Sequence, residues 1–266
     1  MPFDTMQAAQ IVKSAKKAKI QSSIIYMGPS LIDGAPIMVI AVISKRNRKT
    51  GAMLQTYIMR SDIDPRHASA QGLDVSICGA CPLRGDINPG GKQAKNRPCY
   101  VVLGQGPTIV YKSYLNGLYP LVSGFDAIAE IGANRMVRIG TYGDGAAVPA
   151  HIWQALLSRA NGHTAYSHQS GLAQSAFDPA IYMVSADSEA QARAAWETGK
   201  RTFRVIDTVS DIVKGKEILC PASKEAGART TCFTCGLCGG NGVKAKSIAI
   251  PAHGNGATHI RKRNAA

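Results

Sequence analysis

The seven cysteines of this chain lie in two short tracts, and their spacing is typical of metal ligation. The first tract is Cys78, Cys81 and Cys99, and the second is Cys220, Cys232, Cys235 and Cys238. Thiols two residues apart on a tight turn can bind one soft metal centre, because both sulfurs then point to the same place. An odd cysteine count argues against a framework made of disulfides alone. The pattern therefore predicts a metalloprotein with two cysteine-ligated centres.

The second tract predicts a centre whose ligands all come from the protein. Cys232, Cys235 and Cys238 form overlapping Cys-x2-Cys pairs, and Cys220 can supply a fourth thiolate. Overlapping triplets are typical of iron–sulfur ligation, whereas a zinc ribbon has two separate pairs. We expect a [4Fe–4S] cluster here, with Zn²⁺ as the alternative because zinc also accepts four thiolates. Either centre would be structural or electron-transferring.

The first tract supplies only three thiols, which leaves two interpretations open. In one, His67 or a carboxylate completes a structural site. In the other, one coordination position stays open, as is characteristic of catalytic metal sites that bind water, substrate or a cofactor. The second interpretation predicts that Cys78, Cys81 and Cys99 hold a reactive centre.

The charge balance favours a polyanionic partner. The 266 residues include 31 basic and 17 acidic residues, which gives a net charge of +14. An excess of this size is typical of proteins that bind nucleic acid, although a generally basic surface is the simpler alternative. Two basic segments are candidates for phosphate contacts. Their residues are Arg46, Arg48 and Lys49 in a loop and Arg261, Lys262 and Arg263 near the C-terminus.

The apolar patterns predict an α/β fold. Strand-like runs at Ser23–Met27, Pro36–Ile43 and Met53–Met59 indicate an N-terminal antiparallel β-meander. Beyond the first tract, short apolar runs alternate with helical stretches, which favours a parallel sheet with right-handed crossovers. We expect strands at Tyr100–Leu103, Met136–Gly140, Thr164–Ser167, Ala180–Ser185, Thr202–Ile206, Glu217–Leu219 and Ser247–Ile250, and helices at Ala127–Ile131, Pro149–Arg159 and Ser188–Thr198.

These elements fit a complete or partial (β/α) barrel-like parallel sheet with cysteine-rich metal-binding loops. The expected division of the chain is an N-terminal helix plus β-meander over residues 1–65, a barrel-like domain with both cysteine sites over 66–255, and a basic tail over 256–266.

Polar residues recur where the expected strands end, which is where α/β proteins build their active sites. Tyr142, Asp144 and His168 are the candidates for substrate contact or proton transfer. Gln105 and Asp187 are the candidates for cofactor contact. Each has a structural alternative: Asp187 could cap a helix, Asp144 could belong to a turn, and His168 could be a satisfied interior histidine.

Several familiar functions are excluded by missing motifs. The chain has no phosphate-binding loop of the Gly-x4-Gly-Lys-Ser/Thr type, no Gly-x-Ser-x-Gly elbow and no His-Glu-x2-His helix. It also has neither a signal-peptide core at its start nor an apolar run of the roughly 20 residues that a membrane span needs. We therefore expect a cytoplasmic protein that does not bind a membrane.

Four segments resemble a family of proteins carried by bacteriophages and plasmids. They are Gln55–Asp62, Ser76–Gly85, Gly140–Asp144 and the stretch from Cys220 to Cys238. The likeness covers residues 50 to 255 and implies a mobile-element protein acting in a bacterial host cytoplasm.

A weaker likeness is to the radical S-adenosylmethionine superfamily, which pairs a partial (β/α) barrel with a three-cysteine [4Fe–4S] site. The segment Gly143–Pro149 is similar to the Gly-Glu-Pro segment of that superfamily. The spacing of Cys78, Cys81 and Cys99 departs from its Cys-x3-Cys-x2-Cys pattern. If the likeness holds, it implies S-adenosylmethionine as a cofactor.

Three functions follow as hypotheses. The first is a phage- or plasmid-type metalloprotein, with iron–sulfur or zinc centres, that acts on or near nucleic acid. The second is a radical-type iron–sulfur enzyme acting on a small molecule or a modified base. The third is a non-catalytic, zinc-stapled interaction module that binds a host protein.

Overall fold

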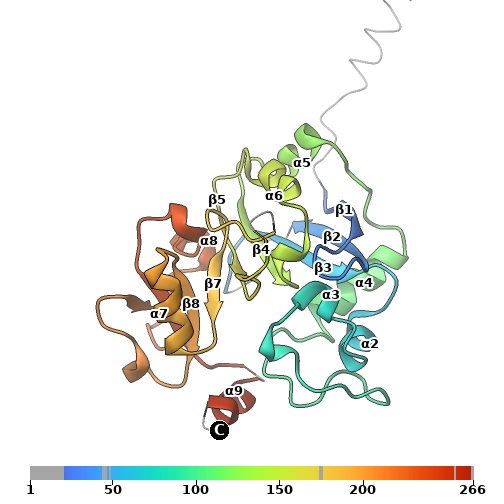
Figure 1. Cartoon of the computed structure of the whole chain (residues 1–266). Helices are drawn as coiled ribbons and strands as arrows, with labels where there is room; N and C mark the ends of the chain where they lie inside the picture. Colours follow the sequence, from blue (N-terminus) through green and yellow to red (C-terminus); the bar gives the residue numbers. More distant parts are fainter. Residues whose placement is uncertain (1–20, 44–46, 48, 174–175, 255, 265–266) are drawn as a thin grey trace, which may run out of the picture.

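The structure is a computed structural model, and it describes residues 21–43, 47, 49–173, 176–254 and 256–264, with the side chains of 262–264 excepted. The helix expected within residues 4–17 lies outside this range. In the part that is described, the strands form two five-stranded sheets that lie next to each other (Figure 1).

The first sheet begins with the predicted meander. Strands β1 (Ser23–Pro29), β2 (Pro36–Ile43) and β3 (Leu54–Arg60) are antiparallel neighbours, so this prediction is confirmed. Strands β4 (Met136–Tyr142) and β5 (Gly162–Thr164) extend the sheet in parallel, in the order β1-β2-β3-β4-β5. Because β3 pairs directly with β4, the meander and the later part of the chain share one sheet.

The second sheet is parallel throughout. It contains β6 (Tyr166–Ser167), β7 (Met183–Ala186), β8 (Thr202–Ile206), β9 (Glu217–Leu219) and β10 (Ser247–Pro251) in the order β6-β7-β8-β10-β9. This arrangement confirms the expected mixture of antiparallel and parallel strands in an α/β fold.

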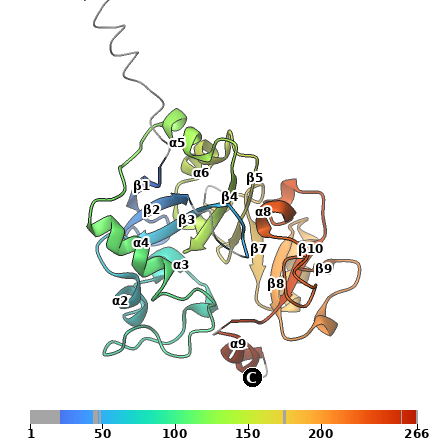
Figure 2. The same ribbon diagram turned by 180° about the vertical axis from the view of Figure 1, so that it is seen from behind.

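Helices cover both sheets. In Figures 1 and 2, α2 and α3 lie on one side of the first sheet and α5 and α6 on the other, while α7 packs against β7 and β8. The helices are α2 (Pro65–Ala70), α3 (Val75–Cys78), α4 (Gly106–Leu115), α5 (Phe125–Gly132), α6 (Ala150–Leu157), α7 (Glu189–Glu197), α8 (Cys232–Cys235) and α9 (Ala257–Asn264). The last of these shows that much of the expected basic tail is helical.

The described strands do not form the expected barrel. The predicted strand Thr164–Ser167 is divided at Ala165, whose N–H donates to the carbonyl of Cys238 and whose carbonyl accepts from Met183. The chain therefore passes from the first sheet to the second at this residue. Two open sheets result in place of one closed barrel.

The strand expected at Tyr100–Leu103 is wrong. This segment is an irregular loop that leads into α4. The Arg97 guanidinium donates to the carbonyls of Cys99 and Val101, at 3.3 and 2.6 Å. Those carbonyls are thus satisfied by a side chain and need no neighbouring strand.

A large apolar core holds the first sheet and its helices together. Trp153 on α6 is fully buried, and its indole N–H donates to the carbonyl of Gly145 at 2.9 Å, so this polar group is also satisfied. A smaller cluster around Met183, Cys238 and Ile248 lies in the second sheet. Among the described helices, none is both long enough and apolar enough to cross a membrane.

Candidate functional site

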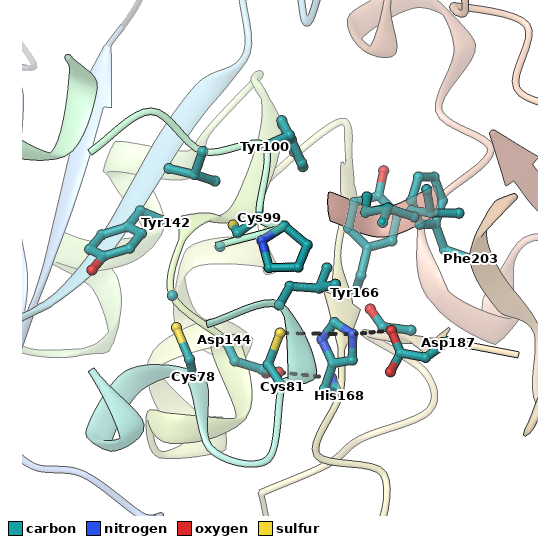
Figure 3. Close-up of a pocket in the computed structure, with 18 of the residues that line it drawn as sticks. Cys78, Cys81, Cys99, Tyr100, Tyr142, Asp144, Tyr166, His168, Asp187 and Phe203 are labelled. Atoms are coloured by element: carbon teal, nitrogen blue, oxygen red, sulfur yellow. Dashed lines mark hydrogen bonds and ion pairs between the residues drawn. The ribbon is translucent and has the colours of Figure 1, made fainter. Parts of the chain in front are cut away.

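A cavity of about 160 Å³ opens beside the first cysteine tract. It lies near the carboxyl ends of β4, β6, β7 and β8, so both sheets contribute to its walls (Figure 3). Seven of its lining residues had been singled out from the sequence. They are Cys78, Cys81, Cys99, Tyr142, Asp144, His168 and Asp187. The structure thus brings the three thiols of the first tract together with four predicted polar residues.

The loop between Cys78 and Cys81 is held against the strand ends by Gln169. The Gln169 amide donates to the carbonyl of Cys78 at 2.8 Å and accepts from the N–H of Ala80 at 3.3 Å. Gly79 lies under this side chain with a φ of +52°, and a Cβ at that position would stand 2.3 Å from the Gln169 oxygen. Only glycine fits there, because the backbone conformation and the close approach both exclude a side chain.

An ion pair between buried Asp74 and partly exposed Arg84 holds the same loop from the other side. Asp74, at the start of α3, is 2% exposed and accepts two hydrogen bonds from Arg84, at 2.8 and 2.9 Å. The Arg84 guanidinium also donates to the carbonyls of Gly72 and Gly79. Since removing one member of a buried pair leaves an uncompensated charge, this pair makes the loop geometry hard to change.

His168 lies between Cys81 and Asp187 (Figure 3). Its Nε2 atom is 3.9 Å from the Cys81 sulfur and 3.4 Å from Asp187 Oδ1. Burial by itself would lower the pKa of His168, but its interactions with Asp187 and Cys81 outweigh burial and raise the pKa well above the ordinary value. The raised pKa therefore favours the protonated form of the His168 imidazole next to the Cys81 thiol.

Both oxygens of the Asp144 carboxylate accept hydrogen bonds from the backbone. The N–H groups of Ala146 and His168 donate to its two oxygens, at 3.0 and 2.9 Å. Its own N–H donates to the carbonyl of Ile77 at 2.6 Å, which ties the end of β4 to the helix that carries Cys78. Burial raises the pKa of Asp144, and these N–H donors oppose the rise. Asp144 thus serves as a positioning residue for the cysteine loop and for His168.

Tyr142 is 2% exposed, and its hydroxyl is buried without a hydrogen-bond partner among the described residues. Burial, together with the negative charge that Cys78 and Asp74 can carry, raises the pKa of Tyr142 well above its ordinary value. The phenol therefore stays protonated next to the first tract.

The three thiols of the first tract act on one another electrostatically. Burial raises the pKa of Cys78 well above its ordinary value, and negative charge at Asp74, Cys81 and Cys99 raises it further. Burial also raises the pKa of Cys99, while the nearby Arg97 opposes this rise. A bound cation would remove the repulsion among three thiolates.

The second tract gathers around the one-turn helix α8. Thr231 caps this helix, and Gly236 ends it in the left-handed conformation, with a φ of +63°. The N–H groups of Cys232 and Phe233 donate to the carbonyls of Lys49 and Thr50, at 3.2 and 2.9 Å. The cysteine turn is thereby attached to the loop between β2 and β3.

The four thiols of the second tract are likewise close enough to interact. Burial raises the pKa of Cys238 to about 12, and negative charge at Cys220, Cys232 and Cys235 contributes to the rise. Burial would lower the pKa of Arg138, but Tyr100 and Tyr166, and after them Cys232 and Cys238, raise it overall. Thiolates in this tract also oppose the fall that burial causes in the pKa values of Lys49 and Arg201. The surroundings of the second tract are therefore cationic.

The chemistry of both sets of thiols fits a soft metal, but the side chains are not arranged around one. Within the described ranges there is no group of three or more His, Cys, Asp or Glu side chains placed to hold a metal ion. No disulfide joins the cysteines either: all seven are free thiols. Metal binding remains a proposal that rests on the type and clustering of the donors.

Other predicted residues lie elsewhere. His67 is exposed on α2 and does not line the cavity; the histidine beside the first tract is His168. Gln105 precedes α4 and lines a neighbouring cavity of about 340 Å³. Lys49 and Arg261 are exposed. Arg46 and Arg48 lie outside the described residues, as do the side chains of Lys262 and Arg263.

Sequence reasoning missed several residues of the cavity wall. Arg138 in β4 is 7% exposed, and Tyr166 and Phe203 face each other with ring centroids 4.3 Å apart. Both rings lie on the part of the wall away from Cys78 (Figure 3). An arginine in the middle of the apolar run Met136–Gly140 was a usable signal, since a charged residue in a buried strand needs a partner.

The fold and the site define an α/β protein with a cysteine-lined cavity between two open sheets. No family model, no curated protein and no solved structure matches this chain.

Proposed function

We propose that this protein is a metal-dependent enzyme in which Cys78, Cys81 and Cys99 hold a reactive centre at the wall of the cavity. The observation that carries the proposal is the common cavity itself, which the three thiols share with His168 and Asp187. A metal centre with fewer than four protein ligands can accept a substrate atom, and an adjoining cavity gives the substrate room.

In this proposal the centre supplies either Lewis-acid or redox chemistry. The residues around it have separate tasks. His168 holds a proton at Nε2 next to Asp187 and can donate it to a bound molecule, or it can complete the ligand set of the centre. Asp144 and Gln169 keep the loop that carries Cys78 in place through their hydrogen bonds to the backbone.

Cys220, Cys232, Cys235 and Cys238 would hold a second, closed centre with a structural or electron-transferring role. Four thiolates give such a centre a net negative charge, which cationic neighbours stabilise. Lys49, Arg138 and Arg201 are those neighbours.

The test is metal and acid-labile sulfide content, with a visible spectrum, on protein purified without oxygen. We expect two centres per chain in the wild type and one in Cys81→Ser. Iron with sulfide and absorbance near about 400 nm would identify cysteine-ligated clusters, and zinc without colour would identify zinc sites. Seven freely titrating thiols and no bound metal would overturn the proposal.

A radical S-adenosylmethionine enzyme is the second candidate, because a cavity bordered by three cysteines also borders Gly143 and Asp144. Each oxygen of the Asp144 carboxylate already accepts one backbone N–H, so a contact with the cofactor would use its remaining acceptor positions or the backbone of this segment. Reductive cleavage of S-adenosylmethionine by the iron-loaded protein would support this candidate. A zinc-only protein would remove it.

A further inference from the structure

Arg138 is a buried cation without an acidic partner among the described residues. Its side chain lines the cavity, and its one hydrogen bond to protein in the described part runs from Nη2 to the Tyr100 hydroxyl at 2.6 Å. A guanidinium has five N–H donors, and no Arg138 nitrogen is among the described polar atoms that are both buried and unpaired, so its free donors are open to the cavity. An anion entering the cavity would find these donors ready.

A second cation lies on the other side of Tyr100. Lys49 Nζ is 5.8 Å from the centre of the Tyr100 ring and contacts the His253 imidazole. Lys49 lines the neighbouring cavity, which shares Tyr100, Val101 and Arg138 with the cysteine-lined cavity. Among the described residues that line this neighbouring cavity there is no aspartate or glutamate. Lys49 and Arg138 thus place two positive charges at one site, and the thiols of the second tract are the acidic groups that act on both.

The cysteine-lined cavity itself is mainly aromatic on the wall next to Arg138. Tyr166 and Phe203 form this wall, and the Arg138 guanidinium lies 5.8 Å from the centre of the Tyr166 ring. Rings of this kind stack on nucleobases at about 1–3 kcal/mol per base, because every base has a π-face. The aromatic wall of Tyr166 and Phe203 therefore lies next to the positive charge of Arg138.

We propose that the two cavities together bind a nucleoside phosphate, with the base against Tyr166 and Phe203 and the phosphate between Arg138 and Lys49. This inference rests on the proposed function, since it names the substrate class of the same centre. The base would then lie between the aromatic wall and the first cysteine tract. A dianionic phosphate suits two cations better than a single carboxylate does, and the net charge of +14 fits a phosphate carried by a strand.

The experiment measures binding of four nucleoside monophosphates to metal-replete protein by calorimetry, with adenosine and inorganic phosphate as partial ligands. We expect any nucleoside monophosphate that binds to have a higher affinity than adenosine alone or inorganic phosphate alone. Arg138→Met should weaken binding by about 10- to 100-fold, the range for hydrogen bonds to a charged group. Lys49→Gln tests the same site at a side chain that is exposed, and it should weaken binding by about 3- to 10-fold while the metal content of the second tract stays as in the wild type.

Arg193→Met is the matched control, because Arg193 is an exposed arginine on α7 that pairs with Glu189. It should bind as the wild type does. Equal affinity for adenosine and its monophosphate, or unchanged binding in both Arg138→Met and Lys49→Gln, would overturn the inference.

Binding of a single strand of about eight nucleotides, a length within the usual range for one binding site, distinguishes nucleic acid from a free nucleotide as the ligand. Tighter binding of the strand, with a steeper loss of affinity in salt, identifies nucleic acid as the substrate. Equal or weaker binding identifies a free nucleotide.

Metal content on the same samples separates this inference from the proposed function. Nucleotide binding without metal overturns the metalloenzyme alone, and bound metal without nucleotide binding overturns the nucleotide site alone. Arg138→Met could lose metal while its affinity for nucleotide stays unchanged. That result would show that Arg138 only neutralises Cys232 and Cys238, and it would overturn the inference.

Discussion

The two cysteine tracts have the same donor atoms but different surroundings. The first lines a cavity together with His168 and Asp187, and a buried carboxylate, Asp74, acts on one of its thiols. The second has Cys238 packed in a small apolar cluster and is surrounded by three cations, Lys49, Arg138 and Arg201. Cations stabilise an anionic centre with four thiolates, whereas the thiols of the first tract have both a cation, Arg97, and a carboxylate, Asp74, acting on them.

This difference indicates a division of tasks. The second tract connects parts of the chain that are far apart in sequence, because its helix α8 is bonded to the loop before β3 and the carbonyl of Cys238 is bonded to Ala165 between the sheets. The first tract is held in place by residues around it and leaves a face toward the cavity. We therefore expect loss of the second centre to affect the whole fold and loss of the first to affect chemistry.

The largest expected effect follows from removing one ligand of each tract. Cys235→Ala should lower the free energy of unfolding by at least about 3 kcal/mol, given metal-binding free energies of about 10–16 kcal/mol in zinc-finger peptides. Cys81→Ala should cost less than about 2 kcal/mol, because Gln169 and the Asp74–Arg84 pair still hold its loop. Urea unfolding with metal analysis measures both effects.

Thr234→Ala is the control for this comparison, since Thr234 is an exposed residue on the same turn as Cys235 and has no thiol. Equal costs for Cys235→Ala and Cys81→Ala would show that the two tracts do not differ in structural importance. A stable, fully loaded Cys235→Ala protein would show that Cys235 is not a ligand of the second centre.

A smaller effect tests how the first tract is positioned. Gln169→Leu keeps much of the side-chain volume but removes both hydrogen bonds to the Cys78–Cys81 loop. We expect metal affinity of the first tract to fall about 10- to 100-fold, as for other residues that orient ligands, with the second tract unchanged. Competition with a coloured chelator would measure this.

Gln93→Leu is the matched control, because Gln93 is exposed and only its backbone carbonyl takes part in a hydrogen bond. If Gln169→Leu released metal from both tracts alike, the side chain would be acting on the fold and not on the cysteine loop.

The secondary structure was largely predictable from the sequence, because local apolar patterns decide it. The runs Pro36–Ile43, Thr202–Ile206 and Glu217–Leu219 are strands with the predicted bounds. The gathering of Tyr142, Asp144, His168 and Asp187 also followed from a general rule, since carboxyl ends of parallel strands lie at one edge. Their roles stay predictions.

What could not be predicted depends on contacts between distant residues. Nothing in the run around Ala165 shows that its N–H will meet Cys238 and divide the strand between two sheets. His67 was one of the candidates to complete the first tract, whereas the fold brings His168, far along the chain, to Cys81. Spacing identifies donors on one turn, but it does not identify a donor that arrives from another strand.

The smallest expected effect concerns the support of the second tract and depends on pH. The Nε2–H group of His163 on β5 donates to the carbonyl of Ile181 at 2.8 Å, and burial lowers the pKa of His163. The unfolded chain therefore binds the proton before the folded protein does as pH falls. The stability linked to neutral His163 is fully present above the ordinary histidine pKa of about 6.5 and is lost as pH falls from there toward the lowered folded-state pKa.

His163→Gln keeps a polar atom near the Nε2 position but does not titrate. The difference in unfolding free energy between the wild type and this variant should be constant above about pH 7 and should shift against the wild type at lower pH, with a slope of at most about 1.4 kcal/mol per pH unit for one proton. Both proteins release metal in acid, and this shared effect cancels when the unfolding free energy of the variant is subtracted from that of the wild type at each pH. The carbonyl of His163 stands 3.1 Å from where a side chain on Gly239 would begin, next to Cys238. A pH-independent difference would show that His163 contributes nothing to the acid sensitivity of the fold.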